Sequence, residues 1–229
     1  MLPQLQKYIR SHWRMFASLR VEPSRISFIG ISGSIEGGTV TFLVFADDLP
    51  SPILAVRVAR RASVGQNLSK EYHVLERLVK IPHLRDSIPH PLFYTQMGET
   101  FVLGESFLEG EPIIPRMGKD GFPEQTPAQR HMQSVTEWLI SLHHNTAEEL
   151  TSFPLRQYLE TTIKECIDIY MLDSFESKIL GEMVIQGGLE RNIFQFALLH
   201  GDFVPHNILV SERPGNLRIG VIDWISAER

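Results

Sequence analysis

The chain has 229 residues, of which 43% are hydrophobic and 21% are charged, and its formal net charge is -5 at pH 7. This composition is that of a globular protein long enough to bury a core, either as one bilobal unit or as two small domains. The negative balance provides no basic field for nucleic acid, which excludes nucleic acid as the main partner, and a single cysteine, Cys166, is compatible with a reducing cytoplasm.

The N-terminal segment has the pattern of an amphipathic helix. Its apolar residues recur at helical intervals, at Leu2, Leu5, Ile9, Trp13, Phe16 and Leu19. Lys7, Arg10 and Arg14 interrupt any apolar stretch long enough for a signal peptide or a membrane span. We therefore expect no membrane span, and we favour packing of this helix on a neighbouring sheet over binding to a membrane surface.

A glycine-bearing hairpin is predicted next. The strand-like runs 27–31 and 40–45 flank the segment 32–39, which contains Gly33, Gly37 and Gly38. Glycines allow a backbone to approach phosphates closely and to expose its N–H groups to an anion, and the Ser34 hydroxyl would add a donor. The segment lacks regular Gly-x-Gly-x-x-Gly spacing, so an ordinary hairpin turn is the alternative.

The strand-like run 53–59 is apolar except for Arg57 in its middle. A guanidinium in such a strand must either face solvent or pair with a carboxylate, because burial of an unpaired charge is costly. The segment 67–80 is helical in pattern, and Glu71 lies on the same face as its leucines. We predict that Arg57 pairs with Glu71; an exposed arginine and an unrelated glutamate are the alternative.

The middle of the chain predicts a strand and then helices. Residues 100–110 are typical of a buried strand that runs into a linker, and 112–123 are rich in proline and glycine. Helical patterns follow at 126–144 and 153–189. Acidic residues of the second segment either line a site for a cationic substrate or form a solvated helix face, namely Glu160, Glu165, Asp168, Asp173 and Glu176.

Polar residues near the C-terminus surround a predicted hairpin. The runs 207–210 and 217–222 are strand-like, and Pro214-Gly215-Asn216 between them is strong turn chemistry. The open end of the hairpin would bring Asn207 beside Asp223. Asp202 would orient a hydroxyl and accept its proton, while Asn207 and Asp223 offer the oxygen ligands that magnesium prefers. An ordinary hairpin with chance acids is the alternative.

The motif His-Gly-Asp-Phe-x-Pro-x-Asn-Ile-Leu at 200–209, followed by Ile-Asp-Trp at 222–224, resembles the aminoglycoside phosphotransferase and choline kinase family. This family is the small-molecule branch of the protein-kinase-like fold. Protein kinases usually carry arginine where Gly201 stands. The resemblance implies an α+β bilobal fold, with an N-terminal antiparallel sheet and one key helix in residues 1–108 and a mainly helical C-terminal lobe in residues 109–229.

The resemblance also implies roles for individual residues. Arg57 and Glu71 match the strand cation and helix glutamate that hold the phosphates of ATP; most members carry lysine there, and arginine resembles the choline kinase branch. The adenine edge would bond to the backbone at the Glu105 carbonyl and the Phe107 amide. Asp202 would be the catalytic base, and Mg²⁺ would be held by Asn207 and Asp223.

The implied activity is ATP-dependent transfer of the γ-phosphoryl group to a hydroxyl of a small molecule, such as an aminoglycoside, a choline-like amino alcohol or a sugar, in the cytoplasm. Family members continue past the second metal ligand with further helices, so we expect a C-terminal lobe that is truncated relative to theirs. A non-catalytic nucleotide-binding module is the alternative. A protein kinase is disfavoured, because no activation segment follows Asp223.

Overall fold

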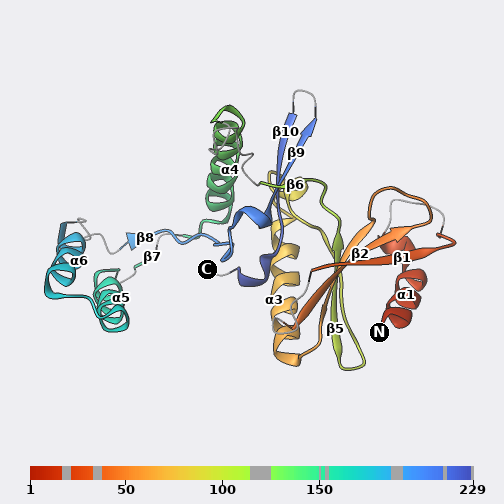
Figure 1. Cartoon of the computed structure of the whole chain (residues 1–229), viewed down its shortest axis with the longest axis horizontal. Coiled ribbons are helices and arrows are strands. Elements are labelled where there is room, and N and C mark those ends of the chain that lie inside the picture. The colour runs from red at the N-terminus through yellow and green to blue at the C-terminus, as the bar shows by residue number, and fades with distance from the viewer. Residues whose placement is uncertain are drawn as a thin grey trace. The chain divides into compact units, whose positions relative to one another are not determined.

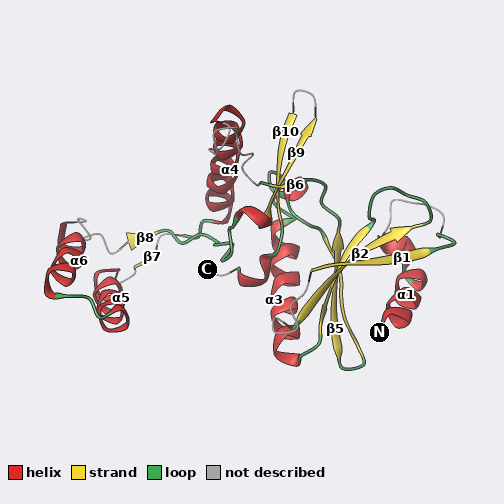
Figure 2. Ribbon diagram, in the orientation of Figure 1, coloured by secondary structure: helices red, strands yellow, loops and turns green. Residues whose placement is uncertain are grey.

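The computed structural model describes residues 1–16, 22–32, 38–113, 125–149, 151–152, 155–186, 193–213 and 216–227. The chain divides into two compact units, Met1–Asn145 with Leu199–Glu228, and Thr146–Leu198 (Figure 1). The predicted lobes, residues 1–108 and 109–229, stay a prediction. The predicted α+β class is confirmed, since an antiparallel sheet dominates the first part of the chain and helices follow it (Figure 2).

The first unit is built on a five-stranded antiparallel sheet in the order β1-β2-β3-β5-β4. Its strands are β1 (Ile26–Ser32), β2 (Thr39–Ala46), β3 (Leu54–Ala59), β4 (Pro91–Met97) and β5 (Thr100–Ser106). These segments are rich in β-branched and aromatic residues, which pack well on a pleated surface. The glycine-bearing loop between β1 and β2, including Ser34, lies largely outside the described residues.

One face of the sheet is covered by the N-terminal helices α1 (Leu2–Ser11) and α2 (Trp13–Phe16). Their apolar positions are buried against strand residues that point to this face, in a cluster of Leu5, Ile9, Trp13, Phe16, Ile26, Val44, Ala46, Leu54, Val56, Val58, Phe93 and Val102. The amphipathic pattern therefore encodes packing on the sheet, as predicted. None of the helices in the described part of the chain carries an apolar stretch that could cross a bilayer.

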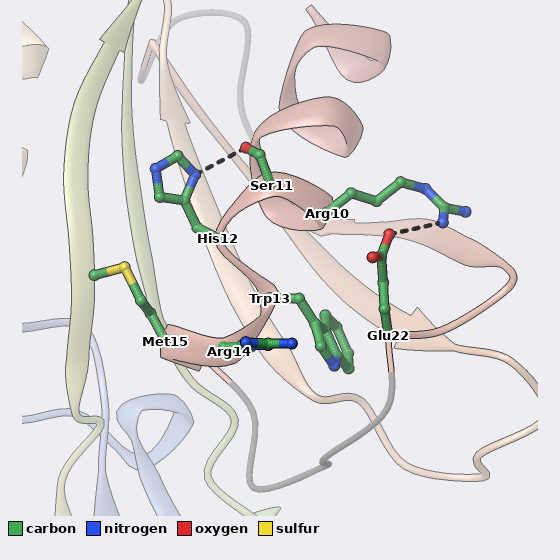
Figure 3. Close-up of a pocket in the computed structure, with 7 residues that line it drawn as sticks. All are labelled: Arg10, Ser11, His12, Trp13, Arg14, Met15 and Glu22. Atoms are coloured by element: carbon green, nitrogen blue, oxygen red, sulfur yellow. Dashed lines mark hydrogen bonds and ion pairs between the residues drawn. The ribbon is translucent and has the colours of Figure 1, made fainter.

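A cavity of about 280 Å³ lies at the junction of α1 and α2 (Figure 3). The Arg10 guanidinium donates to the carbonyls of Pro23 and Ser24 at 2.9 and 2.7 Å and pairs with Glu22. A nitrogen of the His12 ring lies 2.9 Å from the Tyr8 carbonyl. The Arg10 bonds tie α1 to residues 22–24, which precede β1, so the polar groups around this cavity have a structural role.

The opposite face of the sheet is covered by α3 (Ala62–Leu78). The helix begins at Ala62, five residues before the predicted start at residue 67, because Gly65 is a packing residue and not a helix breaker. A Cβ atom at Gly65 would lie 2.3 Å from the Phe101 ring, so only glycine allows this approach of helix and sheet. In this arrangement Leu68 of α3 packs against Ala59 and Leu103 of the sheet.

The remainder of the first unit contains α4 (Gln125–Thr146) and a small sheet in the order β10-β9-β6, formed by β6 (Glu111–Pro112), β9 (Ile208–Arg213) and β10 (Asn216–Val221). The predicted C-terminal hairpin is confirmed by six registered pairs from Asn216↔Arg213 to Val221↔Ile208. Short 3₁₀ turns lie at Arg85–Ser87, Pro205–Asn207 and Trp224–Ser226. Asn207 therefore precedes β9 instead of beginning it.

The second unit contains α5 (Leu155–Tyr170) and α6 (Ser174–Gln186), with the two-residue strands β7 (Thr151–Ser152) and β8 (Ile193–Phe194). The Asp173 carboxylate accepts from the amides of Phe175 and Glu176, and the Glu176 carboxylate accepts from the Asp173 amide. This reciprocal cap explains why the predicted helical segment divides here. The predicted Gly187-Gly188 stop lies outside the described residues.

Candidate functional site

Arg57 joins three parts of the first unit at one buried guanidinium. Nη1 donates to Oε1 of Glu71 on α3 at 2.5 Å, and Nη2 donates to Oδ1 of Asp223 at 2.7 Å. The same Glu71 oxygen accepts from the backbone amide of Trp224 at 2.8 Å. The predicted pairing of Arg57 with Glu71 is thus present, and no pattern in the sequence indicates that Asp223 also contacts Arg57.

The site carries more acid than base. Burial raises the pKa of Glu71 to about 7, although Arg57 opposes this effect, and Oε2 of Glu71 is buried without a hydrogen-bond partner. Burial, together with the charge of Glu71, raises the pKa of Glu105 to about 8. Burial alone would lower the pKa of Arg57, but the carboxylates of Glu71 and Asp223 raise it. One guanidinium therefore faces three carboxyl groups, an imbalance that an added cation would relieve.

Asp202 and Asn207 form a second polar pair. The Asn207 amide nitrogen donates to both the backbone carbonyl and Oδ2 of Asp202, each at 3.0 Å. The backbone carbonyl of Asn207 accepts from the amide of Ile222 at 3.0 Å, which fixes this pair beside the residue that precedes Asp223. The side-chain oxygen of Asn207 makes no hydrogen bond to any described residue, so it stays open to a ligand.

Asp223 itself has a left-handed backbone, with φ 66° and ψ 66°. This conformation ends β10 and turns the chain into the 3₁₀ segment that buries Trp224. The Asp223 side chain is 35% exposed, so one carboxylate reaches both Arg57 and solvent.

His200 and Gly201 brace the segment that carries Asp202. His200 is buried, and its Nε2 donates to the Ile222 carbonyl at 3.0 Å while Nδ1 accepts from the Asp202 amide at 3.3 Å. Burial lowers the pKa of His200, which favours the neutral ring that this bonding requires. At Gly201, φ is 81° and a Cβ atom would lie 1.9 Å from the Ser226 carbonyl oxygen. A larger residue is excluded by this contact.

The oxygen donors suit magnesium better than a softer metal. In the described ranges, no group of three or more His, Cys, Asp or Glu side chains is arranged around one metal position. A set of one carboxylate and one amide oxygen, Asp223 and Asn207, fits Mg²⁺ nevertheless, because this ion keeps several waters and shares substrate phosphates. The role of both residues as ligands stays a prediction.

A row of half-exposed apolar residues lies on the same sheet face as Arg57. The registered pairs Ile29↔Leu43, Leu43↔Ala55 and Ala55↔Glu105 run across four strands. Residues that pair directly across antiparallel strands share a face, and Ala55 lies two residues before Arg57 on β3. Sequence reasoning missed Ile29, Leu43 and Ala55. Their alternation with the residues buried under α1 is the pattern that would have identified this row.

The remaining predicted residues lie at the end of β5. Glu105 is the penultimate residue of this strand, and Phe107 follows it directly. The Phe107 amide makes no hydrogen bond to any residue in the described ranges, so it is available to a ligand. Ser34 lies outside the described residues, and its predicted contact with phosphate stays a prediction.

No protein-family model matches this sequence, and no curated protein matches it. Solved structures do resemble the fold at 16% sequence identity. The GDP complex of a wild-type aminoglycoside 2'-phosphotransferase-IIIa aligns over 98% of this chain and 73% of its own, with a TM-score of 0.56. A GDP and kanamycin complex of an APH(2'') enzyme aligns over the same shares, with a TM-score of 0.55. APH(3'')-Id from Streptomyces rimosus aligns over 99% and 77%, with a TM-score of 0.52. The chain therefore has the protein-kinase-like fold that these aminoglycoside phosphotransferases share.

Proposed function

We propose that the chain is an ATP-dependent phosphotransferase that moves the γ-phosphoryl group to a hydroxyl of a small molecule. The observation that carries this proposal is the convergence on one guanidinium of Glu71 and Asp223, with the Asp202–Asn207 pair tied beside Asp223 through Ile222. Phosphoryl transfer needs positioning and charge neutralisation more than covalent help from the protein, so few residues suffice. The likeness of fold to aminoglycoside phosphotransferases supports the proposal.

The nucleotide would lie along the sheet face that carries Arg57. The half-exposed apolar row of Ile29, Leu43 and Ala55 offers a flat surface for the base, and the free Phe107 amide offers a donor to its edge. Arg57 and Glu71 would position the phosphates. The GDP in two similar structures is consistent with a purine nucleotide as the phosphoryl donor.

Asp202 would act on the acceptor. It is exposed, it is anchored by Asn207 and His200, and its carboxylate would orient the acceptor hydroxyl and take its proton. Mg²⁺, held by Asn207 and Asp223, would neutralise charge on the phosphate oxygens. The acceptor would be an aminoglycoside, a choline-like amino alcohol or a sugar, and we place the reaction in the cytoplasm.

One observation favours the non-catalytic alternative. Oδ1 of Asp223 accepts from the Arg57 guanidinium at 2.7 Å, so part of the charge that this carboxylate would offer to a metal is already neutralised by Arg57. A module that keeps this bond would bind nucleotide weakly or without metal and would not turn over.

A screen of hydroxylated acceptors with ATP and Mg²⁺, followed by ADP release, tests the proposal. We expect turnover on at least one acceptor and a loss of about 10²–10⁴-fold in kcat for Asp202→Ala. The matched control Glu99→Gln, in the exposed turn between β4 and β5, should keep full activity. Magnesium-dependent ATP binding with no turnover on any acceptor would support the non-catalytic alternative, and turnover that survives Asp202→Ala would remove the assigned base.

A further inference from the structure

Glu105 carries a buried carboxyl group for which the proposed mechanism has no use. The residue is 6% exposed, and its side chain makes no hydrogen bond or ion pair with any residue that the structure describes. Arg57, the cation whose charge acts on Glu105, directs its two terminal nitrogens to Glu71 and Asp223 instead. A buried carboxyl without a partner is costly, and natural proteins seldom retain one without a reason.

The Glu105 carboxyl oxygens differ in solvent exposure from Oε2 of Glu71. Among the described buried side chains, only Oε2 of Glu71 is both shielded from solvent and without a partner. Since the Glu105 carboxyl also has no partner, its oxygens must retain contact with solvent. The carboxyl therefore opens onto accessible space, where a ligand can reach it.

The strand register shows where this space lies. Glu105 pairs with Ala55, Ala55 with Leu43, and Leu43 with Ile29, so the carboxyl stands at the inner end of the half-exposed apolar row. At the outer end, Ile29 is 53% exposed. The next row toward the phosphate-binding residues contains Arg57, paired with Leu103. Two residues along a strand span roughly 7 Å.

This arrangement matches a purine nucleotide in three respects. A flat base fits the apolar row, the phosphates fit the adjacent row at Arg57, and the polar edge of the base meets the carboxyl at the inner end. Adenine and guanine both carry an exocyclic amine on that edge, and an amine is a donor for which a carboxyl oxygen is the natural acceptor.

We propose that the Glu105 side chain accepts a hydrogen bond from the exocyclic amine of a bound purine nucleotide and thereby selects bases that carry an amine. The inference rests on the proposed function, since it requires a nucleotide on this sheet face. It assigns Glu105 a role for its side chain, beyond the role of its backbone carbonyl at the adenine edge. Glu105 is then a specificity-determining residue.

The test measures Mg²⁺-dependent binding of matched nucleotide pairs that differ by the amine alone. ATP is compared with purine riboside triphosphate, and GTP with inosine triphosphate, for the wild type and for Glu105→Met, Glu105→Gln and Glu99→Met. For at least one pair, the wild type should bind the amine-bearing nucleotide roughly 10- to 100-fold more tightly, the range expected for a hydrogen bond to a charged or buried group. The pair that shows the effect identifies the base as adenine or guanine.

Glu105→Met should abolish this preference and bring the two affinities within about twofold of each other. Glu105→Gln keeps an acceptor oxygen and should retain part of the preference, and Glu99→Met should retain all of it. Thermal unfolding without ligand checks that the variants fold; Glu105→Met should be at least as stable as the wild type, because it removes an unpaired buried carboxyl.

Equal affinities within both pairs for the wild type, or a preference that persists in Glu105→Met, would overturn the inference while nucleotide binding itself stands. A wild type that binds none of the four nucleotides would instead overturn the proposed function, and the inference with it. The two failures are therefore distinguishable in one experiment.

Discussion

Removal of the Arg57 guanidinium is the perturbation for which the structure makes the most definite stability prediction. Arg57→Met keeps the length and apolar stem of the side chain but leaves Glu71, which is 0% exposed, without its cation. Breaking a buried ion pair by removing one partner costs about 3–5 kcal/mol. For a chain of this size, such a loss lowers Tm by roughly 6–20 °C.

A double variant separates the effect of losing the ion pair from the effect of losing side-chain packing. In Arg57→Met with Glu71→Gln, neither charge is buried alone, and the glutamine side-chain oxygen keeps an acceptor for the Trp224 amide. We therefore expect the double variant to recover most of the stability that the single variant loses. Thermal unfolding followed by tryptophan fluorescence is a suitable assay, because Trp224 is buried and its amide bonds to Glu71.

An Arg57→Met variant that unfolds within about 2 °C of the wild type would contradict this prediction, since a shift this small corresponds to less than about 1 kcal/mol. A double variant no more stable than the single variant would also refute it. That result would mean that Arg57 stabilises the fold through packing and not by pairing with the charge of Glu71.

Two further predictions concern the segment around the site. Gly201→Ala should destabilise the fold by at least about 1–3 kcal/mol in urea unfolding, because φ is 81° and the new Cβ would meet the Ser226 carbonyl; an unchanged unfolding midpoint would show that this contact relaxes freely. Without ligand, stability should fall as pH rises from about 4.5 to about 8, because the folded pKa of Glu105 is raised to about 8 and the folded state binds a proton that the unfolded state releases. Glu105→Met should flatten this part of the profile, and a wild-type profile no steeper than that of the variant would contradict the assignment.

Some contacts followed from the sequence because they are local or chemically forced. An apolar strand with one arginine needs a carboxylate, and Glu71 is only fourteen residues away, so the Arg57–Glu71 pair was predictable. The C-terminal hairpin was predictable from its turn chemistry and its flanking strands.

Other contacts depend on packing that no local pattern encodes. Arg57 and Asp223 are separated by 166 positions, and they meet only because the C-terminal hairpin docks on α3 through the Trp224 amide and Glu71. Glu105 lies in a strand with neighbours on both sides, and its burial depends on this pairing. The start of α3 was misplaced because the fit of Gly65 under Phe101 is a tertiary contact.

The affinity of the chain for ATP, measured calorimetrically with and without Mg²⁺ for the wild type, Asp223→Asn and Asp202→Ala, tests most directly whether these residues form a metal-nucleotide site. Asp223→Asn removes ligand charge, so we predict that it abolishes most of the gain in affinity that Mg²⁺ gives the wild type, whereas Asp202→Ala should retain that gain. Equal effects of Mg²⁺ on all three proteins would contradict the account.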